Sequence, residues 1–424
     1  MRLEIESIDI KDVRAGTEKT YAKDGVLFVN VKELEALILE DPRLKSVDIN
    51  LVYPGDNVRI LNIMDVVQPR CKIDGTDADF PGFVGKMQIA GNGRTRSLRG
   101  IAVLVSDPCT QRKENALLDM AGPISEMSLY GKMKNIHIAA YSAAAVKERD
   151  FENAVKEAGL KTAVYLARGA DKHRVNDVEV YDLDIPNIDR KSSLPRVACY
   201  YQLYSPQFDW RAVSDHVFYG TDVRYLMPTI IHPNEVLDGA IVGWNCIKAL
   251  DTYSNQNHGA IKELYQRHGK DLNFVGVILA TANTEPPARA RSACMAAHQL
   301  KNVLGADGVI LVKIVGGMPH IDLAMTAEEC EKIGVKTAIT TQPLTPFGTL
   351  GDTILFNAAA LNLIITHTAV FERTKINWKA EKFLGGTSET RIFCPDPIEQ
   401  YAGDPEIDIE EYLLPGVLDC TISS

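Results

Sequence analysis

Short apolar runs, some alternating with polar residues, recur along the first 110 residues of the chain. Gly, Pro, Asp and Asn separate these runs, which is typical of β-strands joined by turns. The runs are Leu3–Ile8, Val26–Val29, Ser46–Val52, Asn57–Leu61 and Gly100–Ser106. One helix is predicted over Val31–Glu40, because its apolar residues share a face and Asp41-Pro42 ends it. We therefore expect residues 1–110 to form a β-rich N-terminal domain.

Residues 111–245 combine helical and strand patterns. Phe151–Ala158 has the periodicity of a short helix closed by Gly159, and the apolar run Thr162–Leu166 directly after it predicts a strand. Arg174–Pro195 is polar and contains proline, so we expect an exposed loop there. We interpret residues 111–245 as a mixed α/β region.

Strands and helices alternate more regularly from residue 246 to residue 424. In chain order the predicted elements are a helix marked by Ile261–His268, a strand over Phe274–Ala280, a helix over Pro287–Leu304, a strand over Gly308–Val315, a helix over Thr326–Ile333 and a strand over Lys336–Thr341. This order implies a parallel sheet with helices on both faces. The expected fold class is α/β, with a Rossmann-like α-β-α domain over residues 246–424.

The charge balance limits the classes of partner. The 424 residues include 46 Lys plus Arg and 56 Asp plus Glu, a formal net charge of −10, which argues against binding to a nucleic-acid backbone. Charged residues interrupt the first twelve positions, so no apolar signal core is expected there. The longest apolar stretch, near Leu355–Val370, is broken by polar residues and is too short to span a bilayer. We therefore expect no membrane partner and a cytoplasmic location.

Several cofactor classes lack their sequence motifs. No segment reads GxGxxG or GxxxxGK followed by Ser or Thr, so neither NAD nor a nucleoside triphosphate is expected. No two of the eight cysteines lie within three positions and the nine histidines are scattered, so no metal site is predicted. If the reaction needs a redox-active sulfur or selenium, we expect it on another chain.

Two turns follow strands of the predicted C-terminal sheet, Thr281–Pro286 and Gly316–His320. In an open α/β sheet, ligands bind outside the carboxyl ends of the strands, so both turns are candidates for a substrate site. Arg289 and Arg291 begin the helix after the first turn, and a guanidinium there would hold a carboxylate through two bonds. The alternative is that these arginines are exposed on the face of the helix.

His320 and Asp322 follow the second turn and are candidates for an acid and a base near the substrate. The alternative for the histidine is a loop residue whose nitrogens bind backbone or water. A further candidate lies in the Gly-rich, basic segment Gly91–Arg96, where backbone amides and Arg94 would hold a carboxylate. The alternative for that segment is a hairpin turn between two strands.

The most unusual local feature is an apolar run of small residues that leads to Asn245-Cys246. Such a peptide bond is able to rearrange when the thiol of Cys246 attacks the carbonyl of Asn245 to form a thioester. Removal of the α-proton then expels a thiocarboxylate, and loss of ammonia leaves an N-terminal pyruvoyl group. Both steps need acid–base groups. The candidates that flank the junction in the sequence are His232, Asp238 and His258.

Segments spread along nearly the whole chain resemble those of one known family. They are Met1–Ile5, Asp24–Leu27, Gly91–Gly100, Glu235–Val242, Asn245-Cys246, Leu264-Tyr265 and Leu272–Ile278. On these segments the chain resembles the component B alpha/beta proprotein of glycine, sarcosine and betaine reductases. The D-proline reductase proprotein is a more distant likeness. The most specific part runs from Asp238-Gly239-Ala240 to Asn245-Cys246.

The resemblance implies self-cleavage between Asn245 and Cys246. The products would be a β chain, 1–245, and an α chain, 246–424, which carries a pyruvoyl group made from Cys246. The pyruvoyl carbonyl would activate a small amine or amino-acid substrate as a Schiff base. A selenolate or thiolate of a partner reductase subunit would then displace the amine, and the two fragments are expected to stay together.

Two other classes of function remain open on the sequence, besides a D-proline-reductase-like activity on another substrate. The chain could be an unprocessed, non-catalytic scaffold or docking subunit of a related complex, in which Cys246 stays intact. It could also be a small-molecule-binding α/β protein without chemistry. The number of bands on a denaturing gel separates the self-cleaving proprotein from both.

Overall fold

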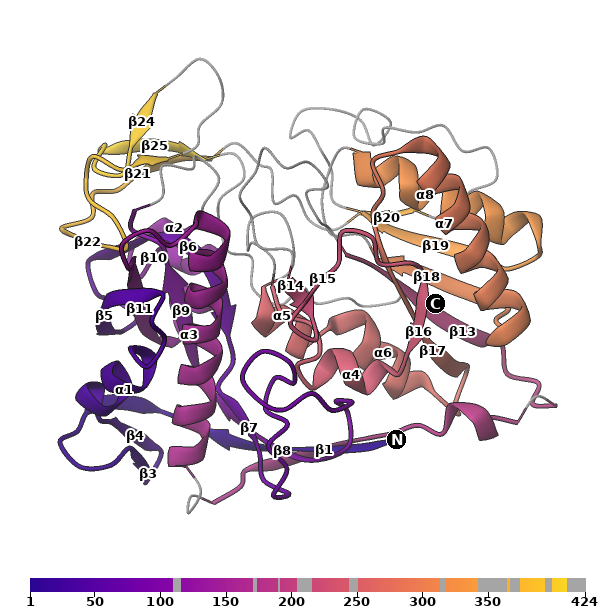
Figure 1. Ribbon diagram of the computed structural model, residues 1–424, viewed down its shortest axis with the longest axis horizontal. Helices are drawn as coiled ribbons and strands as arrows, with labels where there is room; N and C mark the ends of the chain where they lie inside the picture. The colour runs from indigo at the N-terminus through magenta and orange to yellow at the C-terminus, as the bar shows by residue number, and fades with distance from the viewer. Residues whose placement is uncertain are drawn as a thin grey trace.

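The computed structural model places two lobes side by side, each built around a six-stranded sheet, with a four-stranded sheet below them (Figure 1). It describes residues 1–109, 116–170, 174–189, 191–203, 216–243, 251–312, 318–341, 364–366, 374–392 and 399–409. The four-stranded lower sheet has the order β12-β1-β8-β7. Its strands are β12 (Asp177–Asp182), β1 (Arg2–Asp9), β8 (Gly93–Arg99) and β7 (Arg70–Lys72). The predicted α/β fold class is confirmed.

The first lobe has a mixed sheet in the order β10-β6-β9-β11-β5, and β22 also pairs with β6. Its strands are β10 (Ala116–Asp119), β6 (Val58–Val67), β9 (Ile101–Ser106), β11 (Lys134–Ser142), β5 (Leu44–Val52) and β22 (Lys382–Leu384). The long helix α3 (Glu148–Gly169) lies along one face. Every residue of β6 and β9 is buried, because apolar clusters cover both faces of these strands.

The second lobe has a sheet in the order β16-β17-β13-β18-β19-β20. Its strands are β16 (Thr229–Ile231), β17 (Asn273–Thr281), β13 (Arg196–Leu203), β18 (Gly308–Val312), β19 (Lys336–Thr341) and β20 (Ile364–Thr366). All neighbouring pairs are parallel except β16 with β17. The helices of this lobe are α6 (Gly259–Arg267), α7 (Pro286–His298) and α8 (Met318–Lys332).

Side chains that alternate along β13 show which helices pack on each face of this sheet. Ala198 and Tyr200 belong to the apolar cluster formed with α7 and α8, whereas Cys199 and Tyr201 belong to the cluster that contains α6. Successive side chains of a strand point to opposite faces, so the two clusters lie on the two sides of the sheet. The sheet is thus mostly parallel, with helices on both faces and one antiparallel edge strand, β16.

Smaller elements complete the described parts of the chain. The helical ones are α1 (Val31–Ile38), α2 (Pro123–Met127), α4 (Pro233–Leu237), α5 (Thr252–Gln256) and the short turns Tyr130–Lys132, Ile185–Asn187 and Gln299–Val303. The strands are β2 (Asp12–Ala15), β3 (Tyr21–Lys23), β4 (Val26–Val29), β14 (His216–Phe218), β15 (Thr221–Asp222), β21 (Thr374–Asn377), β23 (Arg391–Ile392), β24 (Gln400–Tyr401) and β25 (Glu406–Ile409).

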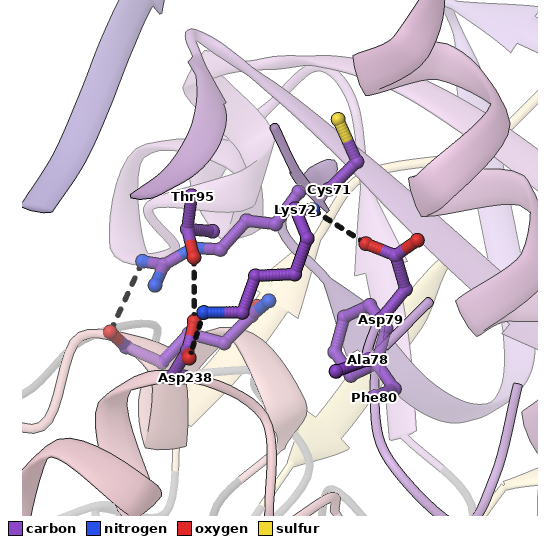
Figure 2. A pocket seen from close by; sticks show the side chains of 9 residues that line it. Cys71, Lys72, Ala78, Asp79, Phe80, Thr95 and Asp238 are labelled. Atoms are coloured by element: carbon purple, nitrogen blue, oxygen red, sulfur yellow. Dashed lines mark hydrogen bonds and ion pairs between the residues drawn. The ribbon is translucent and has the colours of Figure 1, made fainter. Parts of the chain in front are cut away.

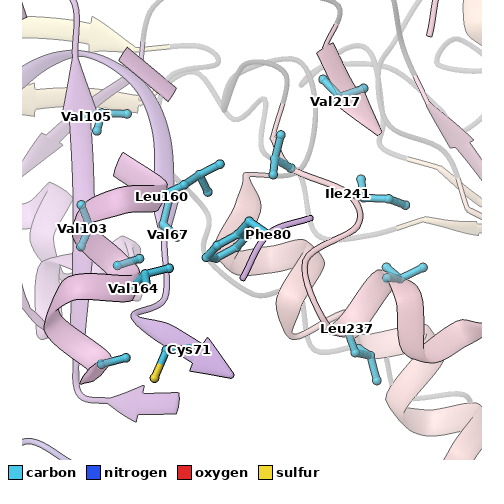
Figure 3. Packing of buried hydrophobic residues seen from close by; sticks show 14 of the residues in the cluster. Val67, Cys71, Phe80, Val103, Val105, Leu160, Val164, Val217, Leu237 and Ile241 are labelled. Atoms are coloured by element: carbon cyan, nitrogen blue, oxygen red, sulfur yellow. The ribbon is translucent and has the colours of Figure 1, made fainter. Parts of the chain in front are cut away.

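One continuous apolar core joins the two lobes. Figure 3 shows Phe80 between Leu160 and Val164 of α3 on one side and Leu237 and Ile241 on the other. Gly239 permits this contact, because a Cβ at that position would lie 2.8 Å from the ring of Phe80. The lobes therefore share buried surface and pack as one body around the middle of the chain.

The structure corrects three predictions about residues 111–245. Thr162–Leu166 is not a strand but part of α3, which passes through Gly159 without a break. Arg174–Pro195 is not only a loop, since it contains β12, the edge strand of the lower sheet. The sheet of the second lobe includes β13 and β16, which precede residue 246. Pairing with distant strands decides each of the last two placements, and a local pattern does not carry that information.

No helix within the described ranges is long and apolar enough to cross a membrane. Among the same residues there is no group of three or more His, Cys, Asp or Glu side chains arranged to hold a metal ion.

Candidate functional site

The two sides of the Asn245-Cys246 junction meet in the structure. Asn245 and Cys246 themselves lie outside the described residues, within 244–250. On either side of this segment, the backbone N–H of Gly243 donates to Oγ1 of Thr252 over 2.8 Å. Gly243, just before this segment, and Thr252, just after it, are therefore in direct contact.

A buried carboxylate in the first lobe binds Thr252 at this contact. Oδ1 of Asp65, on β6, accepts the backbone N–H of Thr252 over 2.8 Å, and Oδ2 accepts the Thr252 hydroxyl over 2.5 Å. Asp65 and Thr252 are both fully buried. Gly243 is needed here for close approach, because a Cβ would lie 2.5 Å from Oδ1 of Asp65 and 3.0 Å from Cα of Asp251.

A second buried carboxyl group, Asp251, lies directly beside Thr252. It caps α5 by accepting the backbone N–H of Ser254 over 2.7 Å, and the hydroxyl of Tyr130 lies 2.9 Å from both of its oxygens. Burial raises the pKa of Asp65 to about 6. Burial, with the charge of Asp65 as the next cause, raises the pKa of Asp251 to about 7. Two carboxyl groups that titrate near neutral pH thus flank the segment.

The two histidines predicted as acid–base groups cap helices. His232 begins α4, where its Nδ1 accepts the N–H of Asn234 over 3.1 Å and its Nε2 lies 3.0 Å from the carbonyl of Leu183. His258 begins α6 and packs edge-on against Tyr201, with 5.0 Å between ring centroids. Burial lowers the pKa of each histidine to about 4, so both are neutral at pH 7. Nε2 of His258 has no hydrogen-bond partner among the described residues.

Asp238, the third predicted acid–base group, lies at the end of α4 and binds residues of the lower sheet. Figure 2 shows its carboxylate reached by Nζ of Lys72 and by the hydroxyl of Thr95. The Thr95 bond is 2.7 Å long, and the N–H of Gly91 donates to the same carboxylate over 2.8 Å. Lys72 and Asp238 are both buried. The described contacts of Asp238 are therefore those of a structural ion pair.

A second polar cluster lies at the carboxyl ends of β13 and β17. Oδ2 of Asp322 accepts a 3.0 Å hydrogen bond from Nε2 of Gln202. Oδ1 of Asp322 lies 3.4 Å from the backbone nitrogen of Asn283. Nε of Arg289 donates to the carbonyl of Asn283 over 2.6 Å. Burial raises the pKa of Asp322 to about 6. His320 is buried nearby and lies within α8, not in a turn before the helix as the sequence predicted.

The structure separates the three predicted arginines. Arg289 is buried at this sheet edge, whereas Arg291 is exposed on α7. Arg94 is exposed on β8 of the lower sheet and pairs with Glu6 over 3.2 Å. Gly91–Arg96 is not a tight hairpin turn, because β8 begins at Gly93 and its antiparallel partner β7 ends at Lys72. Of the predicted substrate-binding groups, the structure thus brings Arg289 together with Asp322.

Comparison with known proteins identifies the family. Residues 1–389 match the family model described as glycine/sarcosine/betaine reductase component B subunits. The chain belongs to this family. No solved structure matches it significantly.

Curated relatives agree with this assignment to component B. A glycine reductase complex component B, subunits alpha and beta, from Acetoanaerobium sticklandii is 36% identical over 346 residues, 80% of this chain and 79% of the relative. The sarcosine reductase complex component B subunit alpha of Peptoclostridium acidaminophilum is also 36% identical, with the same coverage. The betaine reductase complex component B subunit alpha of that organism is 32% identical, over 80% of this chain and 77% of the relative.

The sequence prediction for this component B chain missed Asp65, Asp251, Thr252 and Gln202. Asp65 and Gln202 each interrupt an apolar strand, in Ile63-Met64-Asp65-Val66 and Tyr200-Tyr201-Gln202-Leu203. An ionisable or amide side chain inside a buried strand is costly unless it has partners, so both are visible signals of a polar site. Asp251 carries the signal of a helix N-cap. None of these signals indicates which distant residues the side chains meet.

Proposed function

We propose that this component B chain is a proprotein that cleaves itself between Asn245 and Cys246 and converts Cys246 into a pyruvoyl group. The observation that carries the proposal is the meeting of Gly243 and Thr252 on the buried carboxylate of Asp65. A peptide segment held at both ends next to two titratable carboxyl groups fits a reaction that needs a fixed backbone and proton transfer.

The names of the relatives also support division into two fragments. The Acetoanaerobium sticklandii relative is named for two subunits, alpha and beta, and this chain matches most of its length as one sequence. Cleavage at 245/246 would divide the present chain into two fragments, a number that agrees with the two subunits in that name. The carbonyl and the thiol needed for the cleavage are both supplied by Asn245-Cys246.

We further propose that the cluster at the edge of the second sheet binds a small amine or amino-acid substrate. When present, a pyruvoyl group supplies an electron-withdrawing carbonyl that makes an attached C–N bond easier to break. Arg289 would hold the substrate carboxylate, and Asp322 would accept or return the proton on the substrate nitrogen. The raised pKa of Asp322, about 6, suits that exchange near neutral pH.

A partner subunit of the reductase complex would provide the selenolate or thiolate that displaces the amine. Among the described cysteines, Cys71, Cys199 and Cys330 are buried. Burial raises the pKa of Cys71 and Cys330 to about 12, so these thiols stay protonated and unreactive. This argues against Cys71 and Cys330 as the nucleophile, whereas Cys109 and Cys294 are exposed. An external nucleophile is supported instead by the relatives, which are named as components of reductase complexes.

The proposal is tested by the number and mass of the products. Wild-type chain should give two bands on a denaturing gel, with intact masses that place the break between residues 245 and 246. Cys246→Ala should give one uncut band, because no thiol is present to attack. Cys294→Ala, which removes an exposed thiol elsewhere, is the matched control and should be cut like the wild type. One band from the wild type, with Cys246 unmodified, would contradict self-cleavage and leave the unprocessed scaffold subunit and the small-molecule-binding protein as the alternatives.

A further inference from the structure

Two buried carboxyl groups, Asp65 and Asp251, lie beside the place where the two ends of segment 244–250 meet. Asp65 sits on a strand whose ten residues are all buried, and Asp251 is 3% exposed. Burying two carboxyl groups close together is costly, because each loses its hydration and each disfavours the charge of the other. Asp65 accepts hydrogen bonds from the backbone N–H and the hydroxyl of Thr252, whereas Asp251 accepts them from Ser254 and Tyr130.

The connection from Asp65 to the junction consists of two hydrogen bonds. The Thr252 hydroxyl donates to Oδ2 of Asp65, and the same hydroxyl oxygen accepts the N–H of Gly243. Gly243 is two residues before Asn245, and Asp251 is five residues after Cys246. The charge of Asp65 therefore orients the Thr252 hydroxyl, which in turn fixes the backbone that leads into the junction.

We propose that Asp65 is the positioning residue of the chain cleavage: acting through Thr252, and paired with Asp251, it holds the two ends of segment 244–250 together for the reaction. This inference rests on the proposed self-cleavage and assigns it a site. The site replaces His232 and Asp238 as the groups that serve the cleavage, because the described contacts of those residues hold α4 in place.

The reaction consumes one water and needs no oxidant. In the first step the S–C bond to the Asn245 carbonyl forms and the 245–246 C–N bond breaks, so one proton leaves sulfur and one reaches nitrogen. In the second step the α-proton of residue 246 leaves and its C–S bond breaks, which gives a thiocarboxylate at residue 245 and a dehydroalanine at residue 246. Water then replaces the nitrogen, which leaves as ammonia. Two buried carboxyl groups with pKa values raised to about 6 and about 7 are suited to a reaction with proton transfers in both directions.

The charged and titratable neighbours of the pair set its pH behaviour. Lys156 of α3 acts on Asp65 by lowering its pKa, against the larger effect of burial. Tyr130, Tyr201 and Tyr253 surround Asp251, and burial raises the pKa of Tyr253 to about 12 and those of Tyr130 and Tyr201 further, so they remain neutral. Between pH 5 and 8, ionisation in this group is therefore confined to the two carboxyl groups.

The test follows cleavage of the full chain made by cell-free translation, as the fraction cut against time. Thr252→Val keeps the shape of the side chain but removes its hydroxyl, and cleavage should slow by about tenfold or more, the effect of losing a hydrogen bond to a charged group. Thr252→Ser keeps the hydroxyl and should be cut at close to the wild-type rate. Asp65→Asn is a second variant, which keeps the shape of the anchor and removes its charge. Folding is compared by thermal unfolding of the same variants in an uncut Cys246→Ala background.

A pH profile separates a role in the reaction from a role in folding alone. Wild-type cleavage should fall as the pH drops below about 6, where Asp65 gains its proton. In Asp65→Asn this fall should disappear, because residue 65 then has no proton to gain, and Asp251, with a pKa of about 7, is already protonated in this range. Thr252→Val cut at the wild-type rate, or a fall below about pH 6 that persists in Asp65→Asn, would overturn the positioning role while leaving self-cleavage intact. A wild-type chain that is not cut at all would overturn both proposals.

Discussion

Asp65 shows what a single side chain does when it is buried beside distant backbone. Its partner Thr252 lies 187 residues further along the chain, and Gly243 is in contact with both. The hydrogen bonds offset the cost of burying the carboxylate only if all three residues keep this geometry. At the second cluster, Asp322 depends in the same way on Gln202 and the backbone of Asn283.

The two arginines of α7 form a matched pair for testing the substrate site. Arg289→Ala should raise the half-saturating concentration of an amine substrate by roughly 10–150-fold, since a bidentate contact between charged groups is worth about 1.5–3 kcal/mol. Arg291→Ala should leave it unchanged, because that side chain is exposed to solvent on the same helix. The measurement is borohydride trapping of the substrate on the cleaved protein as substrate concentration rises. Equal shifts in both variants would contradict the assignment of Arg289.

At the scale of elements, helix α3 shows packing overriding a local signal. The sequence predicts a helix that stops at Gly159 and a strand over Thr162–Leu166, but the structure has one helix through both. Gly159 lies where α3 crosses β9, and a Cβ there would be 2.8 Å from Cγ1 of Val105. The glycine therefore permits close packing of helix on sheet and is not a helix end.

Gly159→Ala should destabilise the protein although alanine is the better helix former. The propensity gain is about 1 kcal/mol, while overpacking against the stiff side chain of Val105 costs about 1–3 kcal/mol. The net effect should be a lower midpoint in urea unfolding with little change in slope. Gln266→Ala, at an exposed position of α6, is the control and should not lower the midpoint. A Gly159→Ala midpoint at or above that of the wild type would show that α3 moves away from β9 freely.

At the scale of the whole molecule, the junction lies between residues that build the same sheet. β13 and β16 precede residue 246, and both pair with β17, which follows it. In the other direction, β22 pairs with β6, and Arg59 donates to the carbonyl of Ala402 over 2.6 Å. Strand pairing in both lobes therefore crosses from one predicted fragment to the other.

Cleavage at 245/246 should therefore leave a single particle. On gel filtration without denaturant, fragments 1–245 and 246–424 should elute together at the volume of the uncut Cys246→Ala chain. They should separate only in denaturant, because separation breaks a shared sheet and exposes a continuous apolar core. Elution of the fragments at two volumes would mean that strands on the two sides of the junction do not hold together.

The sequence by itself determined the elements that depend on near neighbours, and it predicts the chemistry that depends on adjacent residues. Helices α1, α6 and α7 and strands β17 to β19 follow from periodicity, caps and glycine ends within a few positions. For α8 only the second half was predicted, because the helix begins at Met318 and not at Thr326. The family, and with it the expectation of an Asn245-Cys246 junction, also follows from short segments of sequence.

Only the tertiary structure decided which residues meet. The strand order that inserts β13 between β17 and β18, and the contacts of Asp65 with Thr252 and of Arg289 with the turn beside Asp322, join positions far apart in the chain. A buried polar residue in an apolar strand reveals that it must have a partner. Which partner it has depends on strand pairing between distant segments, and that pairing is settled by burial over the whole core rather than by local sequence.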